Sequence, residues 1–290
     1  MLWISDEWKD YEVLDASDGE RLERWGKYIL VRPDPQVIWS TPHGAPEWKH
    51  YDARYIRSNT GGGHWSEHSL PERWQIRYRD YLTFNVKPMN FKHTGVFPEQ
   101  AANWDFIREK VAAASARRPV RVLNLFAYSG GATLAAAAGG AEVYHVDASK
   151  GMVAWAKENA AASGLADRPI HWIVDDCGKF IQREIRRGRR YDGIIMDPPS
   201  YGRGPSGEIW KMETSFYPFL QETVKLLSDD PLFVIINSYT TGLAPSAVAY
   251  ASDVVFGAAH GGKTAAGELG LPVKQSGLVL PCGATGRWTP

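Results

Sequence analysis

The hydrophobic and polar positions of this chain follow two patterns, one near its beginning and another in the remainder. In the first part, short segments that alternate apolar and polar residues are separated by Pro, Gly and Asp. The clearest segment is 73–88, where Trp74, Ile76 and Tyr78 alternate with polar side chains. Alternation with a period of two residues is typical of a half-buried β-strand. We therefore expect residues 1–92 to form a small β-rich domain.

After this part, helix and strand patterns alternate. The segment 97–118 has Pro98 at a helix start and apolar residues at helical spacing. Further strands are expected over residues 119–128, 141–148, 170–176, 191–197, 232–239 and 276–283, and helices over 130–140, 150–164, 178–188, 216–227 and 244–260. Most of these strands are near-continuous apolar runs, which indicates a parallel sheet covered by helices on both faces. Residues 93–290 are thus expected to form an α/β domain that binds ligands at the carboxyl ends of its strands.

Composition and charge limit the class of protein. The chain is 44% hydrophobic and 23% charged, and its 33 basic residues balance 33 acidic ones. A zero net charge removes the argument for nucleic-acid binding that a strongly basic chain would supply. A local basic patch stays open, because residues 183–190 hold five arginines and residues 116–118 hold two more. Twelve tryptophans, concentrated before residue 105, further distinguish the two parts.

Cysteine usage and hydropathy indicate a cytoplasmic protein. Cys177 and Cys282 are far apart and belong to no Cys/His cluster, which predicts neither a disulfide framework nor a metal site. No stretch approaches 18 uninterrupted apolar residues, and the first ten residues lack the apolar core of a signal peptide. We expect no membrane span, and the pattern does not specify an oligomeric state.

Polar residues and glycines at the ends of successive strands predict a nucleoside-binding site. Gly130 and Gly131 stand where the first α/β strand turns into a helix, so the backbone there can approach a ligand. Asp147 ends the next strand and can accept both hydroxyls of a ribose. Asp176 ends the third strand and can accept from an adenine amino group. A tight turn and two helix caps are the alternative interpretations of these residues. The missing GxGxxG disfavours NAD, FAD and a nicotinamide oxidoreductase.

The fourth strand ends in Asp197-Pro198-Pro199. Prolines have a fixed φ and no N–H, so they leave a rigid edge of carbonyl groups beside the carboxylate. Such an edge can hold the hydrogens of an amine or ring nitrogen and aim its lone pair at an electrophile. Attack by a ring carbon would instead need a cysteine nucleophile, and Ser200 follows the motif here. Cys282, on the last predicted strand, is the candidate for that role, and a small residue packed at a strand end is the alternative interpretation.

The region from "KHTGVFPEQAANW" to "DPPSYGRG" and beyond resembles the class I S-adenosylmethionine-dependent methyltransferases. The phrase "LNLFAYSGG", with "VDASKG" after it, is most similar to the bacterial group that contains the large-subunit ribosomal RNA methyltransferases making 5-methylcytosine and 7-methylguanine. The resemblance covers roughly residues 92–290. It implies a Rossmann-like, mostly parallel sheet of seven strands whose last strand is antiparallel. The first 90 residues do not resemble the RNA-binding PUA domain that many of these relatives carry.

The resemblance also implies S-adenosylmethionine as cofactor and a role for each matching residue. The cofactor-binding set is Phe97, Gln100, Phe126, Tyr128, Ser129, Gly130, Asp147, Ala148, Ser149, Asp176 and Cys177. In this set Phe126, Tyr128, Ser129 and Gly130 surround the methionine part, while Asp147 holds the ribose and Asp176 the adenine. Asn124, Asp197, Pro198 and Pro199 form the methyl-transfer centre. "TGVFPEQ" replaces an Asp-Gln-Arg-like segment of the relatives, which leaves open whether Glu99 or Gln100 contacts the cofactor.

The residues after the Asp-Pro-Pro motif are expected on a loop that meets the substrate. Ser200, Tyr201 and Arg203 form this set; Tyr201 can stack on a base and Arg203 can bind a phosphate. The leading hypothesis is a methyltransferase that modifies RNA, specifically ribosomal RNA, at an amino group or ring nitrogen. The alternatives are a methyltransferase acting on a protein side chain or small molecule, and a non-catalytic nucleoside-binding RNA module.

Overall fold

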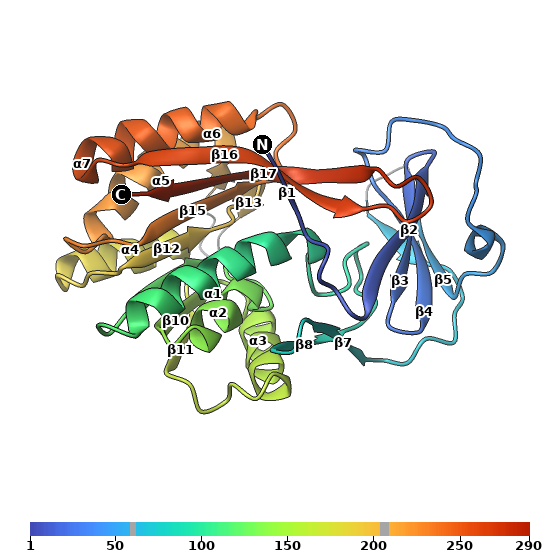
Figure 1. Ribbon diagram of the computed structural model, residues 1–290, viewed down its shortest axis with the longest axis horizontal. Helices are drawn as coiled ribbons and strands as arrows, with labels where there is room; N and C mark the ends of the chain where they lie inside the picture. Colours follow the sequence, from blue (N-terminus) through green and yellow to red (C-terminus); the bar gives the residue numbers. More distant parts are fainter. Residues whose placement is uncertain (59–61, 204–208) are drawn as a thin grey trace. The chain divides into compact units, whose positions relative to one another are not determined.

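The computed structural model describes residues 1–58, 62–203 and 209–290, without the side chain of Arg203, and it divides into two compact units (Figure 1). Both units are discontinuous in sequence. Unit 1 comprises Met1–Trp3, Ala102–Leu269 and Gly283–Pro290, and unit 2 comprises Ile4–Ala101 and Gly270–Cys282. The boundary predicted between residues 92 and 93 falls inside the first segment of unit 2.

A large mixed sheet forms the centre of unit 1 (Figure 1). Among the described residues its strand order is β1-β16-β17-β15-β12-β9-β10-β11. The bounds are β1 Leu2–Ile4, β9 Arg121–Leu125, β10 Glu142–Asp147, β11 Ile170–Val174, β12 Gly193–Met196, β15 Phe233–Ser238, β16 Lys263–Pro272 and β17 Val279–Thr289. Strands β15, β12, β9, β10 and β11 run parallel, and β17 is antiparallel to β15. The predicted Rossmann-like fold with an antiparallel last strand is confirmed. In the described residues the sheet has eight strands and not the predicted seven, because β1, from the beginning of the chain, adds to its edge.

Helices cover both faces of this sheet (Figure 1). Their bounds are α1 Ala101–Ser115, α2 Gly131–Ala138, α3 Lys150–Ala162, α4 Cys177–Arg186, α5 Met212–Thr223, α6 Pro245–Ser252 and α7 Ala258–His260, with a π-helical turn at Asp253–Gly257 and short 3-10 turns at Pro46–Lys49, Pro98–Gln100 and Val224–Leu226. Helices α1, α2 and α3 pack on one face, and α4, α5 and α6 pack with the sheet core on the other. Because side chains alternate along β9, Leu123 and Leu125 both lie on the α4–α5 face, where they are fully buried.

Unit 2 is rich in β-structure, as the alternation predicts. Among its described residues a five-stranded sheet has the order β2-β3-β4-β5-β6, and β7 and β8 form a separate antiparallel pair. The bounds are β2 Tyr11–Ser17, β3 Glu20–Trp25, β4 Tyr28–Pro33, β5 Ala53–Arg57, β6 Gly63–Trp65, β7 Trp74–Tyr78 and β8 Leu82–Val86. Ile76 and Tyr78 point into the core, with exposures of 0% and 1%.

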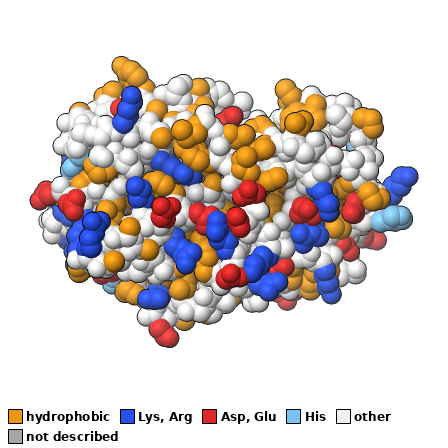
Figure 2. Space-filling view, in the orientation of Figure 1, with side chains coloured by type: hydrophobic (Ala, Val, Ile, Leu, Met, Phe, Trp, Pro, Cys, Tyr) orange, Lys and Arg blue, Asp and Glu red, His pale blue; other side chains and the backbone are white. Residues whose placement is uncertain are grey.

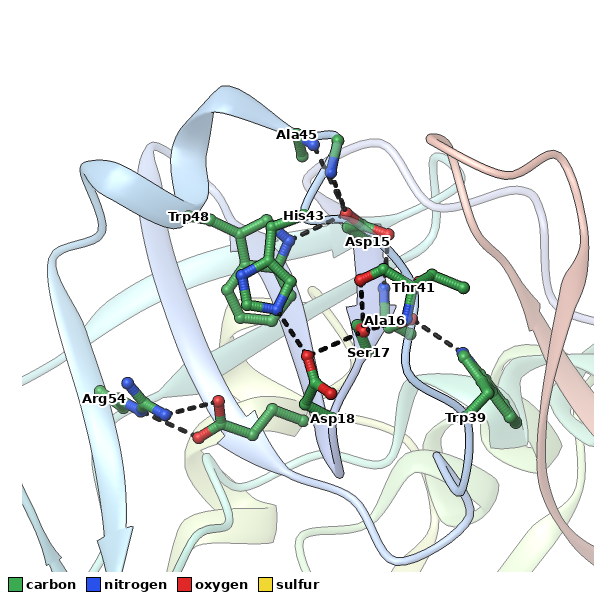
Figure 3. A network of polar contacts seen from close by, with 12 residues as sticks. Asp15, Ala16, Ser17, Asp18, Trp39, Thr41, His43, Ala45, Trp48 and Arg54 are labelled. Atoms are coloured by element: carbon green, nitrogen blue, oxygen red, sulfur yellow. Dashed lines mark hydrogen bonds and ion pairs between the residues drawn. The ribbon is translucent and has the colours of Figure 1, made fainter.

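A polar network fixes the segment between β4 and β5 against strand β2 (Figure 3). The buried carboxylate of Asp15 accepts from the indole N–H of Trp48 at 2.9 Å and from the backbone N–H groups of Gly44 and Ala45. The backbone N–H of Thr41 donates to the Ser17 hydroxyl at 2.8 Å. Because the segment has no strand partner at these points, side chains satisfy its backbone donors.

A buried ion pair in unit 2 gives a first testable prediction. Glu23 is fully buried, accepts from Arg32 at 2.5 and 2.8 Å, and accepts from the Tyr11 hydroxyl at 2.6 Å. Burial raises the pKa of Glu23, but Arg21, Arg32 and these hydrogen bonds outweigh burial and bring it from 4.5 to about 2. Replacing Glu23 with alanine removes the carboxylate partner of the buried Arg32 guanidinium, so we expect the free energy of unfolding to fall by about 3–5 kcal/mol at pH 7.

Urea unfolding at pH 7 and pH 3 measures this effect. Glu12→Ala is the matched control, because Glu12 lies on the neighbouring strand and forms a partly exposed pair with Arg24; a loss of at most about 1 kcal/mol is expected. Since the folded-state pKa of Glu23 is lowered, its contribution is present above pH 4.5 and is lost as the pH falls toward about 2. The difference between Glu23→Ala and wild type should therefore shrink at pH 3. Equal losses for the two variants at pH 7 would contradict this account.

Candidate functional site

The strand order of unit 1 places a ligand crevice at the carboxyl ends of β9 and β12. The chain runs outward from β9 through β10 to β11, and then returns to β12 on the other side of β9. In open α/β sheets ligands bind where the strand order reverses in this way. Leu125 and Met196 are register partners at the ends of these strands, so Phe126 and Asp197 follow at neighbouring positions.

The turn from β9 into α2 has an unusual backbone. Phe126 and Tyr128 adopt left-handed conformations with φ of 55° and 50°, and Gly130 follows with φ of 93°. Left-handed backbone at non-glycine residues costs about 1–3 kcal/mol each and persists only where surrounding contacts fix it. Here the Phe126 N–H donates to the Cys177 sulfur at 3.3 Å, and the Tyr128 N–H donates to Asp147 Oδ2 at 2.8 Å.

Glycine allows this turn to lie close to helix α3. A Cβ on Gly130 would lie 3.0 Å from the Cβ of Ala156. The side chain of the buried Asn159 donates to the carbonyl of Ser129 at 2.9 Å. The structure therefore places Phe126, Tyr128, Ser129 and Gly130 on one turn, and their contact with a cofactor stays a prediction.

Asp147 links this turn to the end of β10. Besides the Tyr128 N–H, its carboxylate accepts from the Ser149 N–H at 2.8 Å. Burial raises the pKa of Asp147 and outweighs these two hydrogen bonds, which act in the opposite direction. Each carboxylate oxygen keeps acceptor capacity for a further donor, such as a ribose hydroxyl. Ala148 is exposed, and Ser149 caps α3 by accepting from the Met152 N–H at 3.3 Å.

Asp176 and Cys177 stand where β11 passes into α4. Asp176 caps this helix, with its side chain accepting from the Lys179 N–H at 2.9 Å, which fits the cap interpretation left open by the sequence. Cys177 is buried, and burial raises the pKa of its thiol. The thiol is therefore protonated at neutral pH and serves as the acceptor for Phe126.

Asn124 faces the layer between the sheet and α2. Its side chain is 3% exposed and donates to the Thr133 hydroxyl at 2.9 Å, which in turn lies 2.9 Å from Nδ1 of His145. Burial lowers the pKa of His145 to about 3, so the imidazole is neutral. The structure thus places Asn124 in a buried polar chain beneath the turn.

The Asp-Pro-Pro segment is held from two sides. Asp197 is partly buried and Pro198 is buried, whereas Pro199 and Ser200 are exposed. The Ser200 hydroxyl lies 2.8 Å from the hydroxyl of Thr240, which follows β15. On the other side, the carbonyl of Pro199 accepts from the indole N–H of Trp210 at 2.6 Å.

The residues after this motif form a hairpin, and the predicted loop is wrong at this point. Strand β13, Tyr201–Arg203, pairs antiparallel with β14, Ile209–Lys211. Trp210 of β14 packs against Phe126 and Phe219, and alternation along a single sequence does not reveal such long-range contacts. Tyr201 is 52% exposed. The predicted contact from Arg203 falls on a side chain outside the described part, as does the segment 204–208.

Two predicted cofactor residues belong to unit 2. Phe97 is the N-cap of the short turn Pro98–Gln100, and Gln100 is buried with an exposure of 7%. Glu99 is also buried, and its carbonyl accepts from the Ser5 hydroxyl at 2.7 Å. The contacts of Phe97, Glu99 and Gln100 with a cofactor stay a prediction.

Sequence reasoning missed three residues that support the site: Asn159, Trp210 and Thr240. Each acts through a long-range contact. A tryptophan so close to a glycine-rich segment was the available signal for Trp210.

Among the described residues, no group of three or more His, Cys, Asp or Glu side chains could hold a metal ion. Likewise, no helix in the described ranges is long and apolar enough to cross a membrane.

Curated relatives match part of this chain. Ribosomal RNA large subunit methyltransferase K from Neisseria meningitidis is 36% identical over 134 residues, which cover 45% of this chain and 37% of the relative. Ribosomal RNA large subunit methyltransferase K/L from Shewanella frigidimarina is 30% identical over 157 residues, or 53% of this chain and 21% of the relative. The chain thus matches only about a fifth to two fifths of the length of these relatives.

Solved structures extend the similarity to the whole chain. A SAM-dependent methyltransferase from Agrobacterium tumefaciens is 37% identical, has a TM-score of 0.92, and is matched over 100% of this chain and 93% of its own. A methyltransferase solved in complex with SAH, the demethylated cofactor, has a TM-score of 0.70 at 19% identity, with 97% and 76% covered, and shares the fold. The family model for S-adenosylmethionine-dependent methyltransferases matches residues 32–229. The chain therefore belongs to the S-adenosylmethionine-dependent methyltransferase family.

Proposed function

We propose that this methyltransferase modifies RNA, specifically ribosomal RNA, at an amino group or ring nitrogen of a base. The observation that carries the proposal is the Asp-Pro-Pro edge after β12, which lies at the register position beside the left-handed turn after β9. One strand end would thus hold the methyl donor and its neighbour the acceptor. S-adenosylmethionine is the cofactor of the family and supplies an electrophilic methyl group.

The cofactor assignments form the first part of this proposal. Phe126, Tyr128, Ser129 and Gly130 would surround the methionine part, and Asp147 would accept the ribose hydroxyls. Asp147 is fixed by two backbone N–H groups, so its orientation is set before the cofactor binds. Ala148 and Ser149 would border the ribose, and Asp176 and Cys177 would lie at the adenine.

Hydrogen-bond acceptors at the edge favour a nitrogen substrate. Methyl transfer from a sulfonium is a direct displacement, so the enzyme mainly has to align nucleophile, carbon and sulfur. The Asp197 carboxylate and the Pro198 carbonyl would hold the hydrogens of an amine and stabilise positive charge as it develops. The Pro199 carbonyl already accepts from Trp210, so its part is to keep the edge in place.

The cysteines do not favour attack by a ring carbon. Such a reaction needs a thiolate that adds to the pyrimidine. Burial raises the pKa of Cys177, and burial also raises that of Cys282. The Cys282 thiol donates to the Leu280 carbonyl at 3.4 Å.

The relatives and one exposed aromatic side chain support RNA as the class of substrate. The curated relatives are named as ribosomal RNA methyltransferases. The exposed Tyr201 offers a ring for base stacking. Most of the arginine run 183–190 is engaged within the protein: Arg183 pairs with Asp175, and Arg187 and Arg189 pair with Glu184. Basic and acidic side chains are interspersed on the face shown in Figure 2, so local contacts would have to select the RNA.

A labelling experiment tests the substrate. The enzyme is incubated with methyl-labelled S-adenosylmethionine and total RNA from cells that lack this gene, and the product is split into nuclease-treated and protease-treated samples. We expect label that nuclease removes and protease does not, followed by an N-methylated base on nucleoside analysis. Protease-sensitive label, or label in a small molecule, would replace RNA with the alternative substrates. 5-Methylcytosine would overturn the nitrogen assignment.

A further inference from the structure

We propose that Trp210 is a positioning residue for methyl transfer, because it joins the Asp-Pro-Pro edge to the turn that would hold the cofactor. The inference rests on the proposed transfer at this edge. Trp210 lies on β14 opposite Gly202 in the hairpin that follows the motif. Its partners belong to both sides of the crevice between β9 and β12.

The first contact of Trp210 is polar. Its indole N–H donates to the Pro199 carbonyl at 2.6 Å, a short hydrogen bond. Gly202 makes room for this approach, since a Cβ there would lie 3.3 Å from Cγ of Pro199. The pyrrolidine ring fixes φ of Pro199, and the direction of its carbonyl determines ψ. The indole thus restrains the backbone torsion that the proline ring leaves free.

The second contact of Trp210 is apolar. Its ring lies 5.5 Å from the ring of Phe126 and 5.3 Å from that of Phe219, which it meets edge-on at 89°. Phe126 and Phe219 are themselves 5.6 Å apart, so the three rings form one cluster. Phe126 is the first left-handed residue of the β9–α2 turn. One side chain therefore fixes the distance between the acceptor edge and the cofactor turn.

The N–H group and the ring of the indole have different roles in this arrangement. The N–H orients the edge that would hold the methyl acceptor, and the ring supports the turn that would hold the donor. In-line transfer is sensitive to displacements of about 1 Å, which can lower the rate about 100-fold. Loss of the N–H should therefore slow transfer with little change in cofactor affinity, whereas loss of the whole ring should affect both.

Two substitutions separate these contributions. Trp210→Phe keeps an aromatic ring and removes the N–H; we expect single-turnover methyl transfer to slow about tenfold, with the Kd for S-adenosylhomocysteine within about threefold of wild type. Trp210→Ala should slow transfer further and also raise that Kd. Trp288→Phe is the matched control, because its buried indole also donates to a backbone carbonyl, that of Gly261 at 3.1 Å, in the same unit. It should keep the wild-type transfer rate.

The readouts separate failure of this inference from failure of the proposed function. Wild-type enzyme that does not methylate RNA refutes the substrate, and the variants are then compared on whichever acceptor the labelling identifies. Trp210→Phe that transfers methyl within twofold of the wild-type rate refutes the positioning role. A raised Kd in Trp210→Phe with an unchanged transfer rate also refutes it. Thermal unfolding of each variant, compared with Trp288→Phe, shows whether a slower rate reflects loss of folded protein.

Discussion

Replacing Asp147 with alanine is expected to weaken binding of S-adenosylmethionine at least about 100-fold, because two hydrogen bonds from ribose hydroxyls to a carboxylate would be lost. The substitution also removes the acceptor for the Tyr128 N–H, which fixes a left-handed residue of the β9–α2 turn. Titration calorimetry with S-adenosylhomocysteine measures the change. Unchanged affinity in this variant would refute the cofactor assignment.

Glu142 provides the matched control for this measurement. It lies at the amino end of the same strand and pairs at the surface with Arg121 and His171, so Glu142→Ala should keep wild-type affinity. The pH dependence gives a second readout. Burial raises the pKa of Asp147 above its ordinary 3.8, so affinity should begin to fall on acidification at a higher pH than for an exposed aspartate. Asp147→Asn, which has no titrating group there, should lack this step.

Replacing Asp197 with alanine is expected to slow methyl transfer and to leave cofactor binding largely unchanged. Cofactor affinity should stay within about threefold of wild type, while single-turnover methyl transfer should fall by about 100- to 1,000-fold, because a group that stabilises developing charge is removed. The two values come from calorimetry and from transfer of labelled methyl groups to RNA. Full transfer activity in Asp197→Ala would exclude Asp197 from the reaction.

Two further variants test this interpretation. Asp197→Asn keeps an acceptor oxygen without the charge, so its rate should lie between those of wild type and Asp197→Ala. Asp229→Ala removes an exposed carboxylate elsewhere in unit 1 and should leave both quantities unchanged. A loss of cofactor affinity in Asp197→Ala as large as that in Asp147→Ala would assign Asp197 to the cofactor instead.

The sequence predicts much of unit 1 because its strands are buried on both faces. Ile194, Ile195 and Met196 are almost fully buried, and such an apolar run is visible without knowledge of its neighbours. The helix over 97–118 was predicted for a similar reason, since Trp104 and Ile107 line its buried face. Strand β16 was not predicted, because its sequence KTAAGELGLP is rich in Ala and Gly and lacks an apolar run.

A site residue can be predicted from the sequence only where its position relative to a strand end is visible in the residues beside it. Asp147 and Asp197 can be singled out because Asp147 ends β10 and Asp197 directly follows β12, and parallel strands end at the same edge. The left-handed backbone of Phe126 was not visible, since nothing in its residue type favours that conformation. The orientation of Asn124 was also hidden, because both faces of a covered sheet are apolar and alternation does not tell them apart. Trp210 contributes through partners distant in sequence.

The position of β17 has a consequence for how the protein is made. Among the strands of the large sheet in the described ranges, β17 is the last to be synthesised, yet it lies between β15 and β16. Until β17 pairs with it, β15 has an unpaired backbone edge, and such edges invite association with other chains. The sheet is therefore completed by insertion of its last strand between two strands that precede it in the chain.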